Sequence, residues 1–166
     1  MGQMKRRAYL DIETTGLSRN YYDITVVGIA LENRKECRVV QLIGDEISDV
    51  RLLKLLSGVD EIYTYNGSRF DMPFIRTKLN VDLNKEFSHR DLMYDCWKHN
   101  LKGGLKVVER KLGIGRNLEG IDGFVAVRLW SDYVNGNDED ALNTLLEYNK
   151  EDVVNLRILR QKLWVG

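Results

Sequence analysis

Two acidic residues end an otherwise apolar stretch near the N-terminus, in the segment YLDIETTGL. If residues 6–13 form a strand, alternate side chains share a face, so Asp11 and Glu13 lie side by side. Two like charges at this spacing repel, and each carboxyl group favours protonation unless a cation lies between them. Mg²⁺ and Mn²⁺ prefer carboxylate oxygens. The pair therefore indicates a metal site, with a solvent-exposed acidic strand end as the alternative.

Two further segments carry acids at positions suited to a functional site. In YNGSRFD, Asp71 follows a predicted strand and begins a predicted helix. It either caps that helix or contributes to a site at the carboxyl end of the strand. In EYNKED, Asp152 lies at the edge of the apolar stripe of the last predicted helix, where a carboxylate needs a partner. Tyr148 lies about 40° from it around the helix axis, so its hydroxyl reaches the same region unless the ring is core.

These segments together supply four acids and a phenol, and none of them places a Lys or Arg at an inward position. Clustered carboxylates without a balancing cation are unstable unless they hold metal. Two metal ions about 3.5–4 Å apart can activate a water molecule and stabilise both the attacking and the leaving oxygen of a phosphodiester. The predicted chemistry is therefore metal-assisted hydrolysis of a phosphodiester.

The elements that must position these residues follow from the pattern of apolar residues and turn formers. β-Branched and aromatic runs predict strands, and 3.6-residue periodicity predicts helices. The predicted strands cover residues 6–13, 22–31, 37–43 and 61–65, and the predicted helices cover 48–56, 72–79, 91–99, 105–112, 122–134 and 138–163. This order predicts an α/β fold: a mixed sheet, with an antiparallel three-stranded meander plus parallel strands, flanked by helices.

Length and composition set broader limits. The 166 residues suit a single domain, 1–166. With 25 basic and 25 acidic residues, bulk charge favours no class of partner. Two cysteines without metal-ligand spacing predict free thiols in a reducing compartment. No apolar run reaches the length of a signal peptide or a membrane span, which predicts a cytoplasmic protein without a membrane partner.

One stretch, residues 98–116, is strongly basic, with six Lys or Arg residues against the single acid Glu109. Such clustering suits a track for nucleic-acid phosphates, on which Lys102, Lys106 and Arg110 are the predicted contacts. A solvent-exposed helix face is the alternative.

The three acidic segments resemble the motifs of the ribonuclease H-like DEDD exonuclease superfamily: Asp-x-Glu on the first strand, Asn-x-x-x-Phe-Asp before a helix, and Tyr-x-x-x-Asp in the last helix. The spacing from Tyr148 to Asp152 matches the DEDDy branch. YNGSRFDMPFI is similar to the second motif of the proofreading domain of family B DNA polymerases. GGLKVVERKLGIGR and IDGFVAVRLW are similar to the stand-alone YprB-type group. The resemblance runs from Ala8 to about Leu163.

The resemblance implies a ribonuclease H-like fold and a 3′→5′ exonuclease that uses two Mg²⁺ or Mn²⁺ ions on single-stranded 3′ ends of DNA or RNA. It implies that Asp11 bridges both ions and that Asp71 and Asp152 complete their coordination. Glu13 would bind one ion and contact the terminal 3′-hydroxyl, and Tyr148 would orient the attacking water.

Weaker parts of the resemblance concern contacts to the nucleic acid. Leu17 would pack on the terminal base, and Thr14 and Thr15 would offer backbone N–H groups to the terminal nucleotide. Asn66 and Phe70 of the second motif are further predicted contacts. Thr and Gly also serve turn formation alone after a strand. Two other functions stay open: a module that binds nucleic acid without cleaving it, and an endonuclease or resolvase on the same fold.

Overall fold

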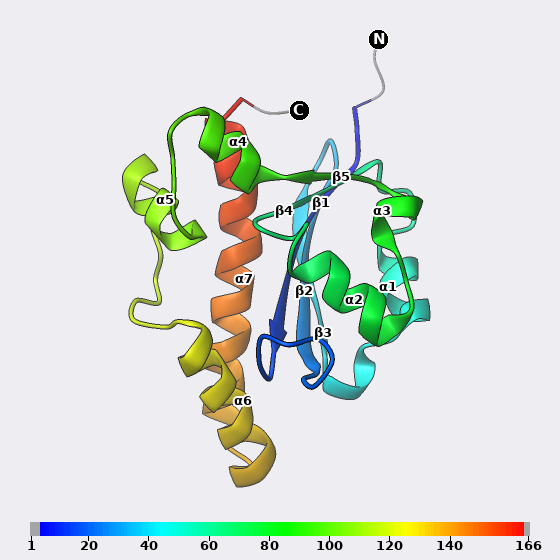
Figure 1. Ribbon diagram of the computed structural model, residues 1–166, viewed down its shortest axis with the longest axis vertical. Coiled ribbons are helices and arrows are strands. Elements are labelled where there is room, and N and C mark those ends of the chain that lie inside the picture. The colour runs from blue at the N-terminus through cyan, green and yellow to red at the C-terminus, as the bar shows by residue number, and fades with distance from the viewer. Residues whose placement is uncertain (1–3, 165–166) are drawn as a thin grey trace.

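A five-stranded mixed sheet organises the chain, in the order β3-β2-β1-β4-β5 (Figure 1). The computed structural model describes residues 4–164. The strands are β1 (Arg7–Thr14), β2 (Ile24–Glu32), β3 (Cys37–Ile43), β4 (Glu61–Thr64) and β5 (Ser88–Asp91). The first three pair as an antiparallel meander, whereas β4 pairs parallel to β1 and β5 parallel to β4. The predicted mixed α/β sheet is confirmed.

Helices cover both faces of this sheet. They are α1 (Asp49–Leu55), α2 (Asp71–Leu79), α3 (Leu83–Glu86), α4 (Leu92–Lys98), α5 (Leu105–Leu112), α6 (Gly123–Gly136) and α7 (Glu139–Lys162), with a 3₁₀ turn at Gly44–Glu46. One apolar core joins a face of the sheet to α1, α2 and α3, and a second core joins the other face to α4, α5 and α7. Figure 1 shows α7 running along the sheet with α6 beside its first half.

The alternation predicted for β1 divides its side chains between these two cores. Ala8, Leu10 and Ile12 enter the core under α1 and α2, and Tyr9 enters the core under α7. The side of β1 that carries Asp11 and Glu13 therefore faces α7. β4 pairs with β1 only as far as Tyr9, so the end of β1 that carries both acids extends past β4.

Two elements were not predicted, β5 and α3. β5 has the sequence SHRD and is an edge strand whose residues are mostly part-exposed, so it lacks the apolar run that marks a strand. α3 is a single turn, too short to show helical periodicity. Both lie between α2 and α4, and β5 extends the sheet beyond β4.

Two sequence predictions about cysteines and membranes have structural counterparts. Cys37 is exposed and Cys96 is buried, and both are free thiols, as predicted. Within residues 4–164, no helix combines the length and the apolar character that a membrane crossing requires.

Candidate metal centre

Three of the predicted acids meet where α7 crosses the end of β1. One carboxylate oxygen each from Asp11, Glu13 and Asp152 lies within 4.8 Å of the other two. Glu13 and Asp152 are buried and Asp11 is half-buried. The strand supplies two adjacent acids through its two-residue period, and the helix supplies the third from the opposite side. These oxygens are near enough to share one cation.

Asp71, the fourth acid, lies outside that group of three but is attached to the same piece of β1. It is buried at the start of α2, and its Oδ1 accepts a hydrogen bond from the Ile12 N–H at 3.0 Å. β4 no longer pairs with β1 at this point, so Asp71 satisfies a strand N–H that has no β4 partner. The peptide that it contacts lies between Asp11 and Glu13.

The electrostatics of the four acids favour protonation over charge. Burial is the main cause that raises the pKa of Glu13 to about 8. Repulsion from Asp152 contributes to this rise more than repulsion from Asp71 does. Burial, followed by repulsion from Asp152 and Glu13, holds the pKa of Asp11 well above its usual range. Burial raises the pKa of Asp71 to about 7 despite the hydrogen bond from Ile12. A divalent cation among these oxygens would relieve the repulsion, and a set of hard carboxylate donors fits Mg²⁺ or Mn²⁺.

Tyr148 borders the acids, as predicted from its position one turn before Asp152. Its hydroxyl accepts a hydrogen bond of 2.5 Å from Lys106 Nζ, which also donates to the Ile121 carbonyl at 2.6 Å. Burial and then repulsion from Asp152 raise the pKa of the phenol, so it stays protonated. Because the hydroxyl accepts from Lys106, its own proton remains available for donation.

Arg116 is a component of the site that sequence reasoning missed. It forms a bidentate ion pair with Glu109, with N–O distances of 2.5 and 2.8 Å, and it also pairs with Asp152. Burial raises the pKa of Asp152, although Arg116 acts in the opposite direction. The acidic segments themselves supply no inward cation, but the basic stretch 98–116 supplies Arg116 and Lys106 to their edge.

The basic stretch is divided between the edge of the acidic site and the protein surface. Arg116 is buried in ion pairs, and Lys106 is half-buried against Tyr148. Lys102 and Arg110 are exposed and face solvent. On α5, Lys106 is half-buried and Arg110 is exposed. The contacts of Lys102, Lys106 and Arg110 with nucleic acid stay predictions.

Asn149 holds Asp11 in place and was also missed. Its Nδ2 donates to Asp11 Oδ2 at 3.1 Å and lies 3.3 Å from the Asp11 carbonyl oxygen, and its Oδ1 accepts from Gln41 Nε2 at 2.9 Å. Gly28 pairs with Asp11 across the β1–β2 ladder, and a Cβ on it would lie 2.0 Å from Asn149 Oδ1. The absence of a side chain on Gly28 therefore lets the amide approach the carboxylate.

A sequence signal for Asn149 existed. It stands four residues after Leu145 and four before Val153, in the middle of the apolar stripe of α7. A fully buried amide on such a stripe needs hydrogen-bond partners, as a carboxylate does.

The second motif forms a tight turn between β4 and α2. Asn66 adopts a left-handed conformation with φ of 59°, and its N–H donates to Asp91 Oδ1 at 2.8 Å. A Cβ on Gly67 would lie 2.2 Å from Thr64 Oγ1, so this position requires glycine. Phe70 is partly buried against the core under α1 and α2. The contacts of Asn66 and Phe70 with nucleic acid stay predictions.

The β1–β2 turn holds the remaining predicted contacts. The Thr14 hydroxyl donates to the Gly16 carbonyl at 2.7 Å, and Thr15 Oγ1 accepts from the Asp23 N–H at 3.0 Å. The Thr15 N–H, predicted to serve a nucleotide, already donates to the Asp23 carbonyl at 2.9 Å. Leu17 is 84% exposed and is free to contact a ligand.

Comparisons with known proteins identify the family. Residues 8–164 match the RNase_H superfamily, and the chain belongs to that superfamily. It is 32% identical over 163 residues to the uncharacterized protein YprB of Bacillus subtilis (strain 168), which confirms the YprB-type resemblance. That alignment covers 89% of this chain and 39% of the relative, so the chain spans well under half of YprB.

Solved structures share the fold at lower identity. The family B DNA polymerase of the archaeon Pyrobaculum calidifontis matches 99% of this chain with 25% of its own, with a TM-score of 0.76 and 18% identity. Brucella melitensis NrnC bound to pGG matches 96% of this chain with 72% of its own, with a TM-score of 0.64 and 18% identity. NrnC with bound Mg²⁺ matches 97% of this chain with 73% of its own, with a TM-score of 0.61 and 17% identity.

Proposed function

We propose that this protein is a metal-dependent 3′→5′ exonuclease that hydrolyses phosphodiester bonds at nucleic-acid 3′ ends in the cytoplasm. The observation that carries the proposal is the meeting of three carboxylates, from Asp11, Glu13 and Asp152, within 4.8 Å of one another. Membership of the RNase_H superfamily supports hydrolysis of a nucleic acid as the reaction.

In this proposal Asp11, Glu13 and Asp152 would hold one divalent ion, and Asp71 would contribute to the coordination of a second. When bound, the two ions supply a nucleophilic water and stabilise the charge on the reacting oxygens. Asn149 fixes the orientation of the Asp11 carboxylate. Glu13 contacts the terminal 3′-hydroxyl, and the protonated phenol of Tyr148 orients the attacking water. The Mg²⁺ bound to NrnC supports Mg²⁺ as one of the ions that this site accepts.

The proposed substrate is the 3′ end of single-stranded DNA or RNA. The fold is shared with a family B DNA polymerase and with NrnC bound to pGG, which supports a nucleic-acid strand as the ligand. The exposed Leu17 and the outward basic residues Lys102 and Arg110 provide an apolar contact for a base and cations for phosphates.

The test uses single-stranded DNA and RNA labelled at the 5′ end, with Mg²⁺ or Mn²⁺. We expect a ladder of labelled products that shortens from the 3′ end, and loss of all cleavage in EDTA or in the Asp152→Asn variant. A closed circular strand should stay intact, because it has no 3′ end. Cleavage of the circle would instead indicate an endonuclease, and cleavage in EDTA would contradict the metal mechanism.

A second candidate function is a module that binds nucleic acid without cutting it. The ion pair between Arg116 and Asp152 favours it, because an internal guanidinium already balances part of the acidic charge. Binding of the same labelled strands without turnover under every metal condition would support this function over the exonuclease.

A further inference from the structure

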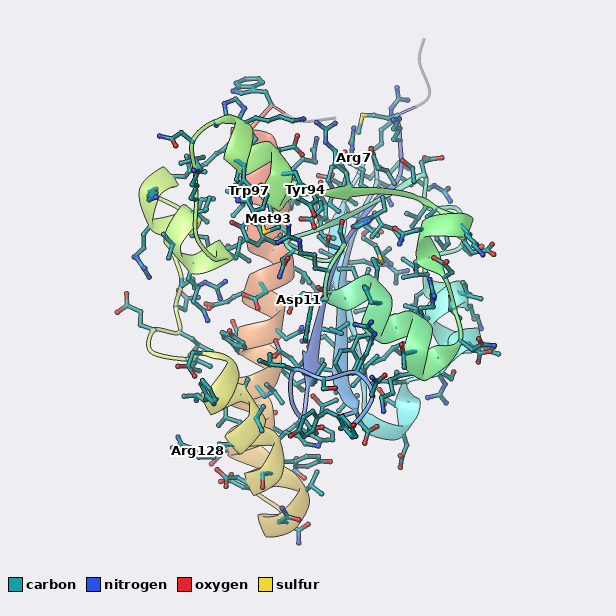
Figure 2. All side chains as sticks on the ribbon, in the orientation of Figure 1. Arg7, Asp11, Met93, Tyr94, Trp97 and Arg128 are labelled. Atoms are coloured by element: carbon teal, nitrogen blue, oxygen red, sulfur yellow. The ribbon has the colours of Figure 1, made fainter. Side chains whose placement is uncertain are left out.

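A cluster of two aromatic rings and one guanidinium lies on the surface, apart from the acids. Tyr94 and Trp97 of α4 pack edge to face with their ring centroids 5.2 Å apart. The guanidinium carbon of Arg69 lies 5.9 Å from the Tyr94 centroid and 5.5 Å from the Trp97 centroid. Tyr94 is 37% exposed and Trp97 is 40% exposed, so part of each ring faces solvent. Figure 2 shows both rings together on α4, above Asp11 in that view.

The charge around these rings is positive. Within residues 4–164, no carboxylate forms an ion pair with Arg69, whose positive charge rests on the two rings alone. Asp95 is the one acid on α4, and Arg90 holds it in a bidentate pair at 2.9 Å while Lys98 lies 3.6 Å away. The cluster therefore presents aromatic surface and a cation with no competing negative charge.

The fold ties this cluster to the second motif. Arg69 stands two residues before Asp71, so their Cα atoms are at most about 7–8 Å apart. Asp91 caps α4 and also accepts hydrogen bonds from the Asn66 N–H at 2.8 Å and the Ser68 N–H at 3.1 Å. One carboxylate thus joins the start of α4 to the turn that leads into Asp71. A strand end held by the acids can reach α4 within a few nucleotides.

We propose that Arg69, Tyr94 and Trp97 form a binding site for single-stranded nucleic acid, in which the rings stack on bases that lie 5′ of the nucleotide being removed and Arg69 binds a phosphate. Aromatic rings beside a cation are the chemistry that binds single strands without reading their sequence. The inference rests on the proposed function for the polarity of the strand. Its consequence is that the protein prefers oligonucleotides to dinucleotides.

The binding experiment uses 5′-fluorescein-labelled dT12 and rU12 with Ca²⁺, and fluorescence anisotropy gives the Kd. Trp97→Ala or Tyr94→Ala should weaken binding about tenfold or more, because each removes a ring that stacks on a base. Trp97→Phe should keep most of the wild-type affinity, because it retains an aromatic ring. Arg69→Gln should reduce the salt dependence of binding, because it removes a phosphate contact. Quenching of tryptophan fluorescence by dT12 should fall in Trp97→Phe.

Leu53→Ala is the matched control, because Leu53 is also 37% exposed and lies on α1, against the opposite face of the sheet. It should bind dT12 as the wild type does. The hydrolysis of a dinucleotide by Trp97→Ala should equal that of the wild type, since a dinucleotide is too short to occupy both the acids and α4.

The outcomes separate this inference from the proposed function. If the wild type hydrolyses no substrate, but the Trp97→Ala variant binds dT12 more weakly than the wild type, the exonuclease proposal fails and the binding site stands. Wild-type affinity in both ring variants would overturn the binding site. The binding site would also be overturned if Trp97→Ala and Tyr94→Ala lost thermal stability and dinucleotide turnover to the same extent as dT12 binding. That result would assign the rings a structural role.

Discussion

The two ends of the β1–α7 contact carry acids with opposite electrostatics. At one end, Glu32 of β2 accepts hydrogen bonds from the Tyr9 hydroxyl at 2.7 Å and from Arg157 Nε at 2.6 Å, and Arg160 lies 3.6 Å away. Burial acts to raise the pKa of Glu32, but the hydrogen bonds from Tyr9 and Arg157 outweigh it, and the pKa is lowered. This carboxylate is ionised and fully compensated by the protein.

At the other end, Asp11, Glu13 and Asp152 face one another, and burial raises the pKa of each. Repulsion from Asp152 raises the pKa of Asp11 and of Glu13 further, whereas Arg116 acts to lower the pKa of Asp152. The same helix supplies Asp152 to this cluster and, five residues later, Arg157 to Glu32. The contrast shows that α7 can place arginines beside a buried acid. At the cluster of Asp11, Glu13 and Asp152, α7 itself supplies no such arginine. An acidic cluster whose charge is only partly balanced by the protein is suited to an external cation.

The largest expected effect separates the two ends by activity. Asp11→Asn should lower nuclease activity about a thousandfold or more, because it removes a charged ligand worth several kcal/mol in the transition state. Glu32→Gln should keep most of its activity in the same assay of labelled oligonucleotides. Activity above a tenth of the wild type in Asp11→Asn would contradict the assignment of Asp11 to the metal centre.

The next effect separates the two ends by stability. Glu32→Gln should lower the free energy of unfolding by about 2–4 kcal/mol, because it leaves Arg157 and Arg160 without their partner. Asp11→Asn, measured without divalent ions at about pH 8, should unfold at the same or a higher urea concentration than the wild type, because it relieves repulsion. If Glu32→Gln has the wild-type free energy of unfolding, the ion pairs of Glu32 with Arg157 and Arg160 do not contribute to stability.

The acidic cluster should make the protein less stable as pH rises. The pKa of Glu13 rises from 4.5 to about 8 on folding, so between these values the folded state holds a proton that the unfolded state has lost. The free energy of unfolding therefore falls as pH rises through this window. Glu32 has the opposite sign: its contribution is present above its unfolded pKa and is lost as pH falls through the lower folded value.

Without divalent ions, we expect Tm to fall by several degrees between about pH 5 and about pH 8 in a thermal melt. Mn²⁺ should restore more stability at the higher pH, where protons compete less for the carboxylates. Glu13→Gln should flatten this part of the profile. An unchanged slope in that variant would show that other groups set the pH dependence.

The smallest expected effect tests how the acidic cluster is held. Gly28→Ala places a Cβ 2.0 Å from Asn149 Oδ1 and must displace the amide that binds Asp11. We expect a loss of about 1–2 kcal/mol in stability and of about tenfold in activity, measured by urea unfolding and oligonucleotide hydrolysis. Gly104→Ala is the control, since nothing lies within 4 Å of its Cβ position. Equal behaviour of the two variants would contradict the role of Asn149.

Local periodicity made much of the site predictable from the sequence. The two-residue period of a strand places Asp11 and Glu13 on one face, and the helix period places Tyr148 one turn before Asp152. These relations depend only on neighbouring residues, so the sequence by itself determined them. The same local signals predicted most helices and strands, and they failed at β5, where the edge position allows a polar sequence.

Only the tertiary structure decided which distant residues complete the cluster. Arg116 reaches Asp152 across 36 positions, and Asn149 reaches Asp11 across 138. Gly28 acquires its role because β2 pairs with β1 in one register and α7 crosses that point. Such contacts carry no sequence period, because they depend on how whole elements pack. The sequence therefore determined the acids that need a cation, and packing decided how much of their charge the protein itself balances.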